Sequence, residues 1–267
     1  MVMDIKKIFK VFLTFVALVF TVNIGAQEVL SVRVMSMNIK EGAAYAGNQS
    51  QPYSDLINQY KPDFIALQEV DYKTARNGGK DWLNEVAMQT GMFPYFSKSM
   101  NYQGGGFGPA LLSKYPFYKV EKTIFRHDQA REDRSTAWMY VQLPGGVCLR
   151  VGTLHLSLES SQLTIQHFAS INKAFFAEDE LTPALMIGDY NAAPGSDAIN
   201  YVKNRWQEVI PNMGSTWPSD KPTTQLDHIM GFPKMAWECT HYELIGNPKL
   251  SDHCFIVADL KLTVGNE

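Results

Sequence analysis

The segment Gly188-Asp189-Tyr190-Asn191 places polar side chains directly after an apolar run at 184–187 that is typical of a strand buried on both faces. Alternate residues at the end of a strand point the same way, so Asp189 and Asn191 can face one small target together. A carboxylate beside a carboxamide suits a phosphoryl group with a hard cation, because the carboxylate holds metal or water and the amide donates to a phosphoryl oxygen. Gly, Asp and Asn also favour β-turns, so this segment alone leaves a turn and a phosphate site equally open.

Further polar residues stand at or just past other apolar runs of the chain. Each has a structural alternative: an Asn can cap a turn, a Glu can lie in a solvated loop, and a core His can bond to backbone. Side chains carried at strand ends on a rigid scaffold tend to converge on one edge. The order of these residues therefore indicates one functional site, built from Asn38, Glu69, His155, Asp189, Asn191, Asp227, Asp252 and His253.

Strands dominate the expected secondary structure, with a few helices between them. Antiparallel hairpins mix with crossovers, so two sheets packed face to face with helices outside would bury this many apolar strands. The helices are expected at 53–59, 82–90 and 163–176, the second of them ended by Gly91. The strands are expected at 29–37, 62–67, 110–112, 137–143, 147–154, 184–187, 226–230, 237–244 and 254–262.

Residues 1–26 have the order of a secretory signal peptide. Three lysines precede an apolar run at 11–22, and small residues end at Ala26. This run is shorter than the roughly 20 residues that span a membrane, which disfavours the alternative of an uncleaved anchor. Ile24 fits poorly two positions before the cut, so the cleaved bond stays open. We expect an exported protein, periplasmic or extracellular, in which 27–267 form a single domain with no further membrane-spanning segment.

Composition limits the partners and the covalent framework of this chain. The formal net charge is −3, and it becomes −5 once residues 1–26 leave, because three lysines and one aspartate go with them. An acidic chain without a Lys/Arg run lacks the footprint of tight nonspecific nucleic-acid binding, although metal ions can supply positive charge in a nuclease. Cys148, Cys239 and Cys254 show no paired spacing and predict no disulfide framework, although a Cys239–Cys254 bridge stays open.

Six short motifs follow one another along the chain: Met37-Asn38-Ile39, Leu67-Gln68-Glu69-Val70, Thr153-Leu154-His155-Leu156, Gly188-Asp189-Tyr190-Asn191, Leu226-Asp227-His228-Ile229 and Ser251-Asp252-His253. In this order they resemble the motifs of the endonuclease/exonuclease/phosphatase superfamily. That superfamily includes deoxyribonuclease I-like and exonuclease III-like enzymes, neutral sphingomyelinases and inositol polyphosphate 5-phosphatases. The resemblance runs from about Val32 to Leu262. It implies a four-layer α/β/β/α sandwich of two mixed, largely antiparallel sheets with helices outside, and metal-dependent cleavage of a phosphoester.

The resemblance also implies a metal centre. Glu69 would be the principal Mg²⁺ ligand with Asn38 beside it, and Asp252 would complete the shell or hold a second ion. Oxygen ligands from few protein groups suit Mg²⁺, because they leave positions for water and substrate phosphate. Mn²⁺ would be a substitute. Whether the site holds one or two ions stays open.

The remaining motif residues would carry the reaction. His253, paired with Asp227, would act as general base or as a phosphate-contacting imidazolium, because the carboxylate fixes the tautomer and raises the pKa. Asp189 would orient or deprotonate the attacking water, and Asn191 would bind a phosphoryl oxygen. His155 would help the leaving group or stabilise charge in the transition state. Water attacks in line while the metal stabilises the developing charge.

Five residues outside the motifs are weaker candidates. Arg76 and Arg134 resemble arginines that the superfamily carries at similar places; Arg134 could fix Glu69 or contact phosphate, and a surface ion pair is the alternative. Tyr102, Phe107 and Trp217 lie in Gly-rich or Pro-rich loops and could form a substrate wall, with ordinary loop packing as the alternative.

Departures from the superfamily pattern narrow the branch. Repair-type enzymes favour Tyr where this chain has His155, and 5-phosphatases have Trp where it has Ile187. We therefore expect an exported, monomeric, Mg²⁺-dependent hydrolase that cleaves a phosphodiester rather than a phosphomonoester. The expected substrate is a phospholipid headgroup ester such as sphingomyelin, or a nucleic acid or nucleotide. The rival is a catalytically inactive binding module, which should have lost at least one of Glu69, Asp189, Asp227 or His253.

Overall fold

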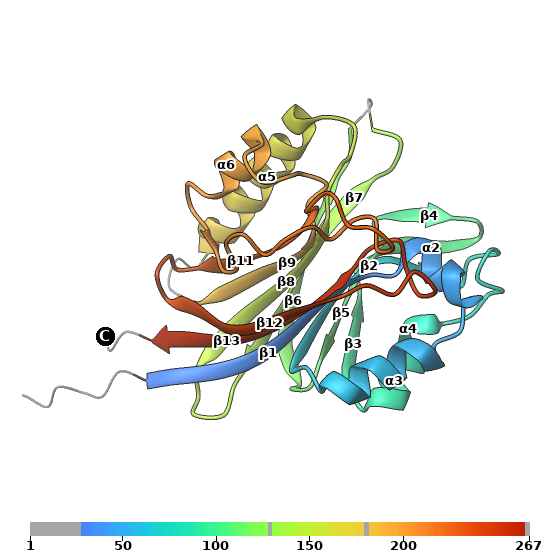
Figure 1. Cartoon of the computed structure of the whole chain (residues 1–267), viewed down its shortest axis with the longest axis horizontal. Helices are drawn as coiled ribbons and strands as arrows, with labels where there is room; N and C mark the ends of the chain where they lie inside the picture. The colour runs from blue at the N-terminus through green and yellow to red at the C-terminus, as the bar shows by residue number, and fades with distance from the viewer. Residues whose placement is uncertain (1–27, 128–129, 179–181, 265–267) are drawn as a thin grey trace, which may run out of the picture.

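The computed structural model describes residues 28–127, 130–178 and 182–264. In this part of the chain the strands form two sheets (Figure 1). The first sheet has the order β12-β13-β1-β2-β5-β3, and β4 also pairs with β5. Among the strand pairs of the described residues in this sheet, only β1 and β2 run parallel. Its strands are β1 (Glu28–Asn38), β2 (Phe64–Tyr72), β3 (Phe93–Phe96), β4 (Met100–Tyr102), β5 (Gly105–Ser113), β12 (Trp237–Ile245) and β13 (Phe255–Val264).

The second sheet has the order β10-β11-β9-β8-β7-β6, in which β8 and β9 run parallel and the other pairs antiparallel. Parallel neighbours need a crossover connection, and here the helix α5 (Ser161–Glu178) supplies it between β8 and β9. The strands are β6 (Phe117–Phe125), β7 (Arg134–Gln142), β8 (Cys148–His155), β9 (Ala184–Asp189), β10 (Gln207–Glu208) and β11 (Asp227–Phe232).

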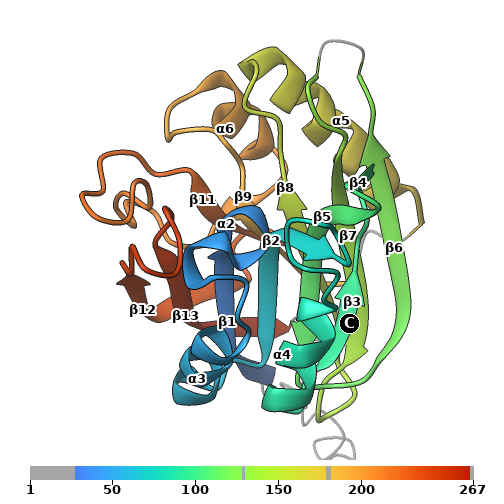
Figure 2. The ribbon, with the colours of Figure 1, turned by 90° about the vertical axis from the view of Figure 1, so that its right-hand side faces the viewer.

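Helices cover the outer face of each sheet, which gives four layers (Figures 1 and 2). On the first sheet lie α3 (Gln51–Tyr60) and α4 (Trp82–Thr90), and on the second lie α5 and α6 (Asp197–Val202). Two short elements follow β1: α2 (Lys40–Ala43) and the 3-10 helix η1 (Ala44–Ala46). The predicted α/β/β/α sandwich is confirmed.

Strand alternation explains why both faces of the first sheet are buried. In β1, Val32 and Val34 face the second sheet, whereas Met35 and Met37 face the helical layer. Successive side chains of a strand point to opposite faces, so an apolar run with both faces covered feeds two cores at once. The same strand then ends at Asn38, where the two sheets present their polar edge.

Several element boundaries differ from the sequence-based expectation. The helix predicted at 82–90 is α4 to the residue, with Gly91 at φ 69° as its cap. The strand predicted at 110–112 is wrong in length, because β5 already begins at Gly105. The glycines at its start gave no strand pattern in the sequence. They are needed because another backbone lies close: a Cβ on Gly108 would collide with the carbonyl oxygen of Ser97 on the adjacent segment. The strands β3, β4 and β6 and the helix α6 were also missed, because they are short or carry polar side chains.

Two further expectations concern covalent structure and the chain start. Cys148, Cys239 and Cys254 all lie in described segments and are free, so no Cys239–Cys254 bridge is present there. The predicted signal peptide, residues 1–26, lies outside the described residues. Among the described residues, no helix is both long enough and apolar enough to cross a membrane.

Candidate active site

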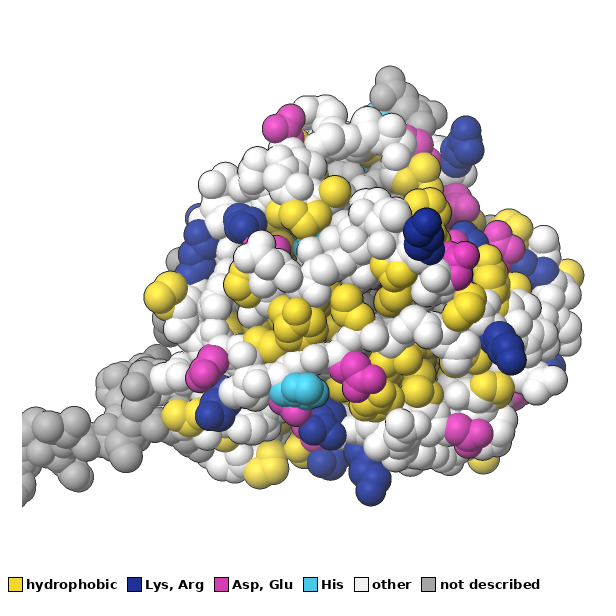
Figure 3. All heavy atoms as spheres, in the orientation of Figure 1, with side chains coloured by type: hydrophobic (Ala, Val, Ile, Leu, Met, Phe, Trp, Pro, Cys, Tyr) yellow, Lys and Arg dark blue, Asp and Glu magenta, His cyan; other side chains and the backbone are white. Residues whose placement is uncertain are grey.

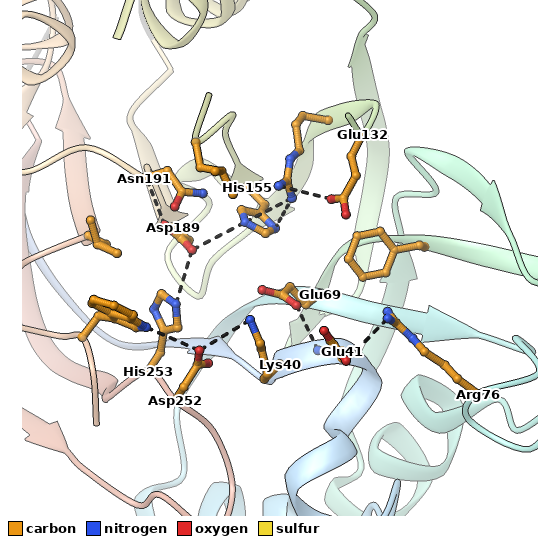
Figure 4. A pocket seen from close by; sticks show the side chains of 15 residues that line it. Lys40, Glu41, Glu69, Arg76, Glu132, His155, Asp189, Asn191, Asp252 and His253 are labelled. Atoms are coloured by element: carbon orange, nitrogen blue, oxygen red, sulfur yellow. Dashed lines mark hydrogen bonds and ion pairs between the residues drawn. The ribbon is translucent and has the colours of Figure 1, made fainter. Parts of the chain in front are cut away.

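Strand register brings three motif residues together at one edge of the second sheet. His155 is the register partner of Asp189 in the parallel pair β8–β9, and Asp189 is the partner of Asp227 in the antiparallel pair β9–β11. All three side chains are buried, at 5%, 1% and 1% exposure. His155 and Asp189 line a cavity of about 350 Å³ (Figure 4). Asp227 stands behind these two residues.

The first sheet contributes Asn38 and Glu69 to the same edge. Glu69 sits at an irregularity between Leu67 and Val70, where the pairing of β2 with β5 shifts, and its φ is 60°. Such a bulge re-aims a side chain, and here the Glu69 carboxylate reaches the cavity. The Asn38 amide donates to Glu69 Oε1 at 3.2 Å and to Asp189 Oδ2 at 3.0 Å. Asn38 therefore ties the two sheets together beneath the cavity.

Asp227 and His253 form a buried ion pair. His253 Nδ1 lies 2.9 Å from Asp227 Oδ2, and its Nε2 lies 3.7 Å from Asp189 Oδ2. Burial disfavours the imidazolium, but Asp227, Asp189 and Asp252 outweigh it and raise the pKa of His253 to about 10. At neutral pH this side chain is a cation that can donate through Nε2 to an anionic group in the cavity.

Asp189 has the opposite perturbation. Burial and the nearby Asp227 carboxylate raise its pKa to about 7, although the backbone N–H of Asn191 donates to its Oδ1 at 2.8 Å. A carboxylate whose pKa lies near neutrality is suited to accept a proton in catalysis. Asn191 is held at φ 48°, and its side chain donates to the carbonyl oxygen of Leu156 at 2.9 Å.

The nearest partner of the His155 ring is an arginine, and the Asp189 carboxylate lies farther away, at 3.5 Å from Nε2. Arg134 Nη1 lies 2.8 Å from its Nδ1 and 3.1 Å from its Nε2, and Glu132 binds Arg134 Nη2 at 3.2 Å. Burial and the Arg134 charge hold the pKa of His155 well below its usual range. Because a guanidinium can only donate, His155 is a neutral imidazole with an accepting ring nitrogen. The structure thus places Arg134 on His155, not on Glu69.

The carboxylates of Glu69 and Asp252 fit a divalent cation. Glu69 and Asp252 both line the cavity, and Asp252 Oδ1 is buried without a hydrogen-bond partner among the described residues. The other oxygen of Asp252 is 3.4 Å from Lys40 Nζ and 3.4 Å from Trp217 Nε1. Ligand atoms of Asp189, Asp227 and His253 also lie within 4.8 Å of one another, but the charged imidazolium of His253 offers no lone pair to a cation. Carboxylate oxygens of this kind suit a hard cation.

Arg76, Tyr102 and Phe107 lie together at one side of the cavity, whereas Trp217 lies beside Asp252. Arg76 binds Asp71 through Nε at 2.6 Å and Nη2 at 2.9 Å, and it stacks 4.6 Å from the Tyr102 ring and 5.2 Å from the Phe107 ring. Arg76, Phe107 and Trp217 line the cavity, whereas Tyr102 lies outside its wall and supports Arg76.

Some cavity residues were not singled out from the sequence. Lys40 and Glu41 directly follow Asn38, and that polar stretch at a strand end was a signal for them. Leu158 and Leu226 carried no such signal, since an isolated apolar side chain does not indicate a site. The missed residues are Lys40, Glu41, Glu132, Leu158 and Leu226.

The sequence pattern of the Endonuclease/Exonuclease/phosphatase family matches residues 21–253. The chain belongs to that family. Its members are metal-dependent phosphoesterases, and the chain is a phosphoesterase of this class. A comparison with curated proteins finds no match.

Solved structures share the fold at low identity. An endonuclease/exonuclease/phosphatase from Bacteroides vulgatus has 16% identity and a TM-score of 0.73, covering 87% of this chain and 99% of its own. A mannosyl-6-phosphatase of Bacteroides thetaiotaomicron has 12% identity and a TM-score of 0.69, covering 86% and 99%. D. rerio TDP2, complexed with a single-stranded DNA product, has 16% identity and a TM-score of 0.66, covering 86% and 98%. At these identities the likeness extends to the fold, and the substrates differ among the neighbours.

Proposed function

We propose that this protein hydrolyses a small phosphoester, preferably a phosphodiester, by in-line attack of a water molecule beside Asp189. The observation that carries the proposal is the cluster around Asp189, which lies 3.5 Å from His155 Nε2 and 3.7 Å from His253 Nε2. A proton acceptor beside two rings that can donate hydrogen bonds suits attack of water on a phosphoryl group. An inactive binding module fits less well, because Glu69, Asp189, Asp227 and His253 are all retained.

In the proposed mechanism Glu69 and Asp252 would hold a divalent cation, Mg²⁺ with Mn²⁺ as substitute. Such an ion supplies positive charge opposite the phosphoryl oxygens when bound. The buried, unpartnered Asp252 Oδ1 supports this assignment. Asn38 would act through Glu69, since its amide donates to that carboxylate.

The chain's own groups handle the protons. Asp189 accepts a proton from the attacking water as the P–O bond to water forms and the P–O bond to the leaving group breaks. His253 donates a hydrogen bond from Nε2 to a phosphoryl oxygen, because Asp227 keeps it charged. His155 is neutral and donates a hydrogen bond to the developing charge on the leaving oxygen. Asn191 would bind a phosphoryl oxygen.

The cavity charges favour a small substrate over a polynucleotide. The cations that the described chain places in the cavity wall are already paired: Lys40 with Asp252, Arg76 with Asp71, and Arg134 with Glu132. Polynucleotide binding depends on Lys and Arg that neutralise successive phosphates. On the face in Figure 3, Lys and Arg side chains are dispersed among acidic ones rather than gathered in a stripe. A lipid headgroup ester or a sugar phosphate suits this surface better.

A nuclease is the second candidate, because the fold neighbour TDP2 was solved with single-stranded DNA. The purified protein should be assayed with Mg²⁺ or Mn²⁺ against plasmid DNA, RNA, sphingomyelin, phosphatidylinositol phosphates, a hexose 6-phosphate and bis-p-nitrophenyl phosphate. We expect turnover of bis-p-nitrophenyl phosphate and of a small ester, and its loss in Glu69→Ala. Preferential degradation of DNA would favour the nuclease, and no turnover of any phosphoester would contradict the proposal.

We further propose that residues 1–26 direct export and that 27–267 form one monomeric domain in the periplasm or outside the cell. The order of charged, apolar and small residues at 1–26 supports export. N-terminal sequencing of protein recovered from cell fractions tests the cleavage, and light scattering of the purified protein tests its mass. A cytoplasmic protein with an intact first segment would contradict export.

A further inference from the structure

The segment Lys40–Ala43 is a left-handed helical turn at the mouth of the cavity. The φ angles of Lys40, Glu41, Gly42 and Ala43 are 47°, 48°, 68° and 67°, and the N–H of Ala44 closes the turn on the carbonyl oxygen of Lys40. Residues other than glycine avoid this conformation, because Cβ approaches the following carbonyl oxygen. Lys40, Glu41 and Ala43 are three such residues, and a run like this persists only where the surroundings over-determine it. Strain of this kind clusters at functional sites.

Two backbone N–H groups of this turn bind side chains of the site. Lys40 N–H donates to Asn38 Oδ1 at 3.1 Å, and Glu41 N–H donates to Glu69 Oε2 at 2.9 Å. Asn38 Nδ2 donates to the other oxygen of Glu69 at 3.2 Å. The chain itself therefore supplies a fixed donor to each oxygen of the Glu69 carboxylate. Figure 4 shows the bond from Glu41.

Gly42 seats the turn on the strand that carries Glu69. A Cβ on Gly42 would lie 2.6 Å from Asp71 Oδ2. Asp71 is buried and accepts hydrogen bonds from Thr74 Oγ1 at 2.8 Å and from Arg76 Nε at 2.6 Å, so it has no room to move aside. Asp71 and Glu69 are alternate residues of β2, so a displaced turn would lose its contact with Glu69.

We propose that this left-handed turn is a positioning device, which holds Glu69 and Asn38 in their ion-binding arrangement before a divalent cation arrives. Gly42 makes this possible, because a glycine lets the turn pack closely against Asp71. The proposal rests on the proposed role of Glu69 as a metal ligand. Ligands already in place bind an ion without the loss of side-chain freedom that loose ligands undergo. Gly42 is thus a positioning residue that acts through Glu69.

The first test is hydrogen exchange of the Glu41 amide in protein treated with chelator. The Glu41–Glu69 bond lies in an exposed part of the molecule, so burial alone does not protect this amide. We expect the Glu41 amide to exchange at least about 10-fold more slowly than in an unstructured peptide. This protection should remain in Glu69→Gln, which keeps an oxygen acceptor, and should be lost in Glu69→Ala. Protection that arises only when Mg²⁺ is added, or that persists in Glu69→Ala, would overturn the proposal.

The second test compares Gly42→Ala with Gly47→Ala by calorimetric titration with Mn²⁺. Gly47 also has a positive φ, 62°, but a Cβ there meets nothing within 4 Å, so it matches the backbone strain without the collision. We expect Gly42→Ala to weaken Mn²⁺ binding about 10-fold or more and Gly47→Ala to change it less than about twofold. Equal effects would overturn the proposal. If Gly42→Ala does not fold, the exchange test on the wild type decides. Failure of the wild type to bind Mn²⁺ would instead refute the proposed function.

Discussion

Replacing Asp227 with asparagine should discharge His253 at mildly alkaline pH. In the wild type, His253 Nδ1 lies 2.9 Å from Asp227 Oδ2. The carboxamide keeps an oxygen that accepts from this nitrogen, but it removes the buried negative charge. Two charges about 4 Å apart at an effective dielectric constant of about 20 interact by about 4 kcal/mol, which corresponds to about three pH units. Because both side chains are buried, at 5% and 1% exposure, solvent screening does not reduce this estimate. The titration midpoint of His253, about 10 in the wild type, should therefore fall by about three pH units in Asp227→Asn.

Nuclear magnetic resonance of the His253 Cε1 proton between pH 5 and 11 measures this midpoint, with a His253→Gln variant to assign the signal. Asp259→Asn is the matched control, because it removes a carboxylate that binds Arg33 on another part of the first sheet. The kcat of Asp227→Asn should fall about 10²- to 10⁴-fold at pH 8. Since the folded pKa of His253 lies above 6.5, its stabilising effect is full below that pH and is lost as pH rises through about 10. A midpoint in Asp227→Asn within half a unit of the wild type would refute the ion pair as the source of the charge.

Three further outcomes follow from the packing. His167 is buried against Phe125, and burial lowers its pKa to about 4. The contribution of the neutral His167 to stability should therefore be full above pH 6.5 and should fall by about 3 kcal/mol as pH drops to about 4. Urea unfolding measures the free energy of unfolding at each pH, and its fall between pH 6.5 and 4 should vanish in His167→Phe. An unchanged fall in this variant would assign the loss to other groups. Gly152→Ala should lower stability by about 1–3 kcal/mol, because its Cβ would lie 2.5 Å from Trp138 Cζ3, and an unchanged melting temperature would contradict this. Trp217→Ala should raise KM for a small ester with little change in thermal stability, since the side chain lines the cavity and is 39% exposed; an unaltered KM would remove Trp217 from the substrate wall.

Local patterns predicted the architecture well where burial imposes a period. The apolar run at 184–187 had to be a central strand, and it is β9, between β8 and β11. The patterns failed where side chains were small or polar, as in β6, whose residues are mostly half-exposed, and in the glycine-rich start of β5. There the tertiary neighbours, rather than the sequence period, stabilise the strand.

The sequence by itself determined the family, the two packed sheets and the kinds of side chain that meet at the polar edge. It could do so because polar residues directly after buried strands are a local signal, and strand ends share an edge whatever the exact register. Only the tertiary structure decided which partner each group has. Arg134 binds His155, which is 21 positions away in the sequence. Asn38 bridges Glu69, 31 positions away, and Asp189, 151 positions away. Each of the first two contacts joins neighbouring strands of one sheet and depends on strand register, where a shift of one residue would send each side chain to the opposite face. The contact of Asn38 with Asp189 joins the two sheets, so it also depends on how they pack.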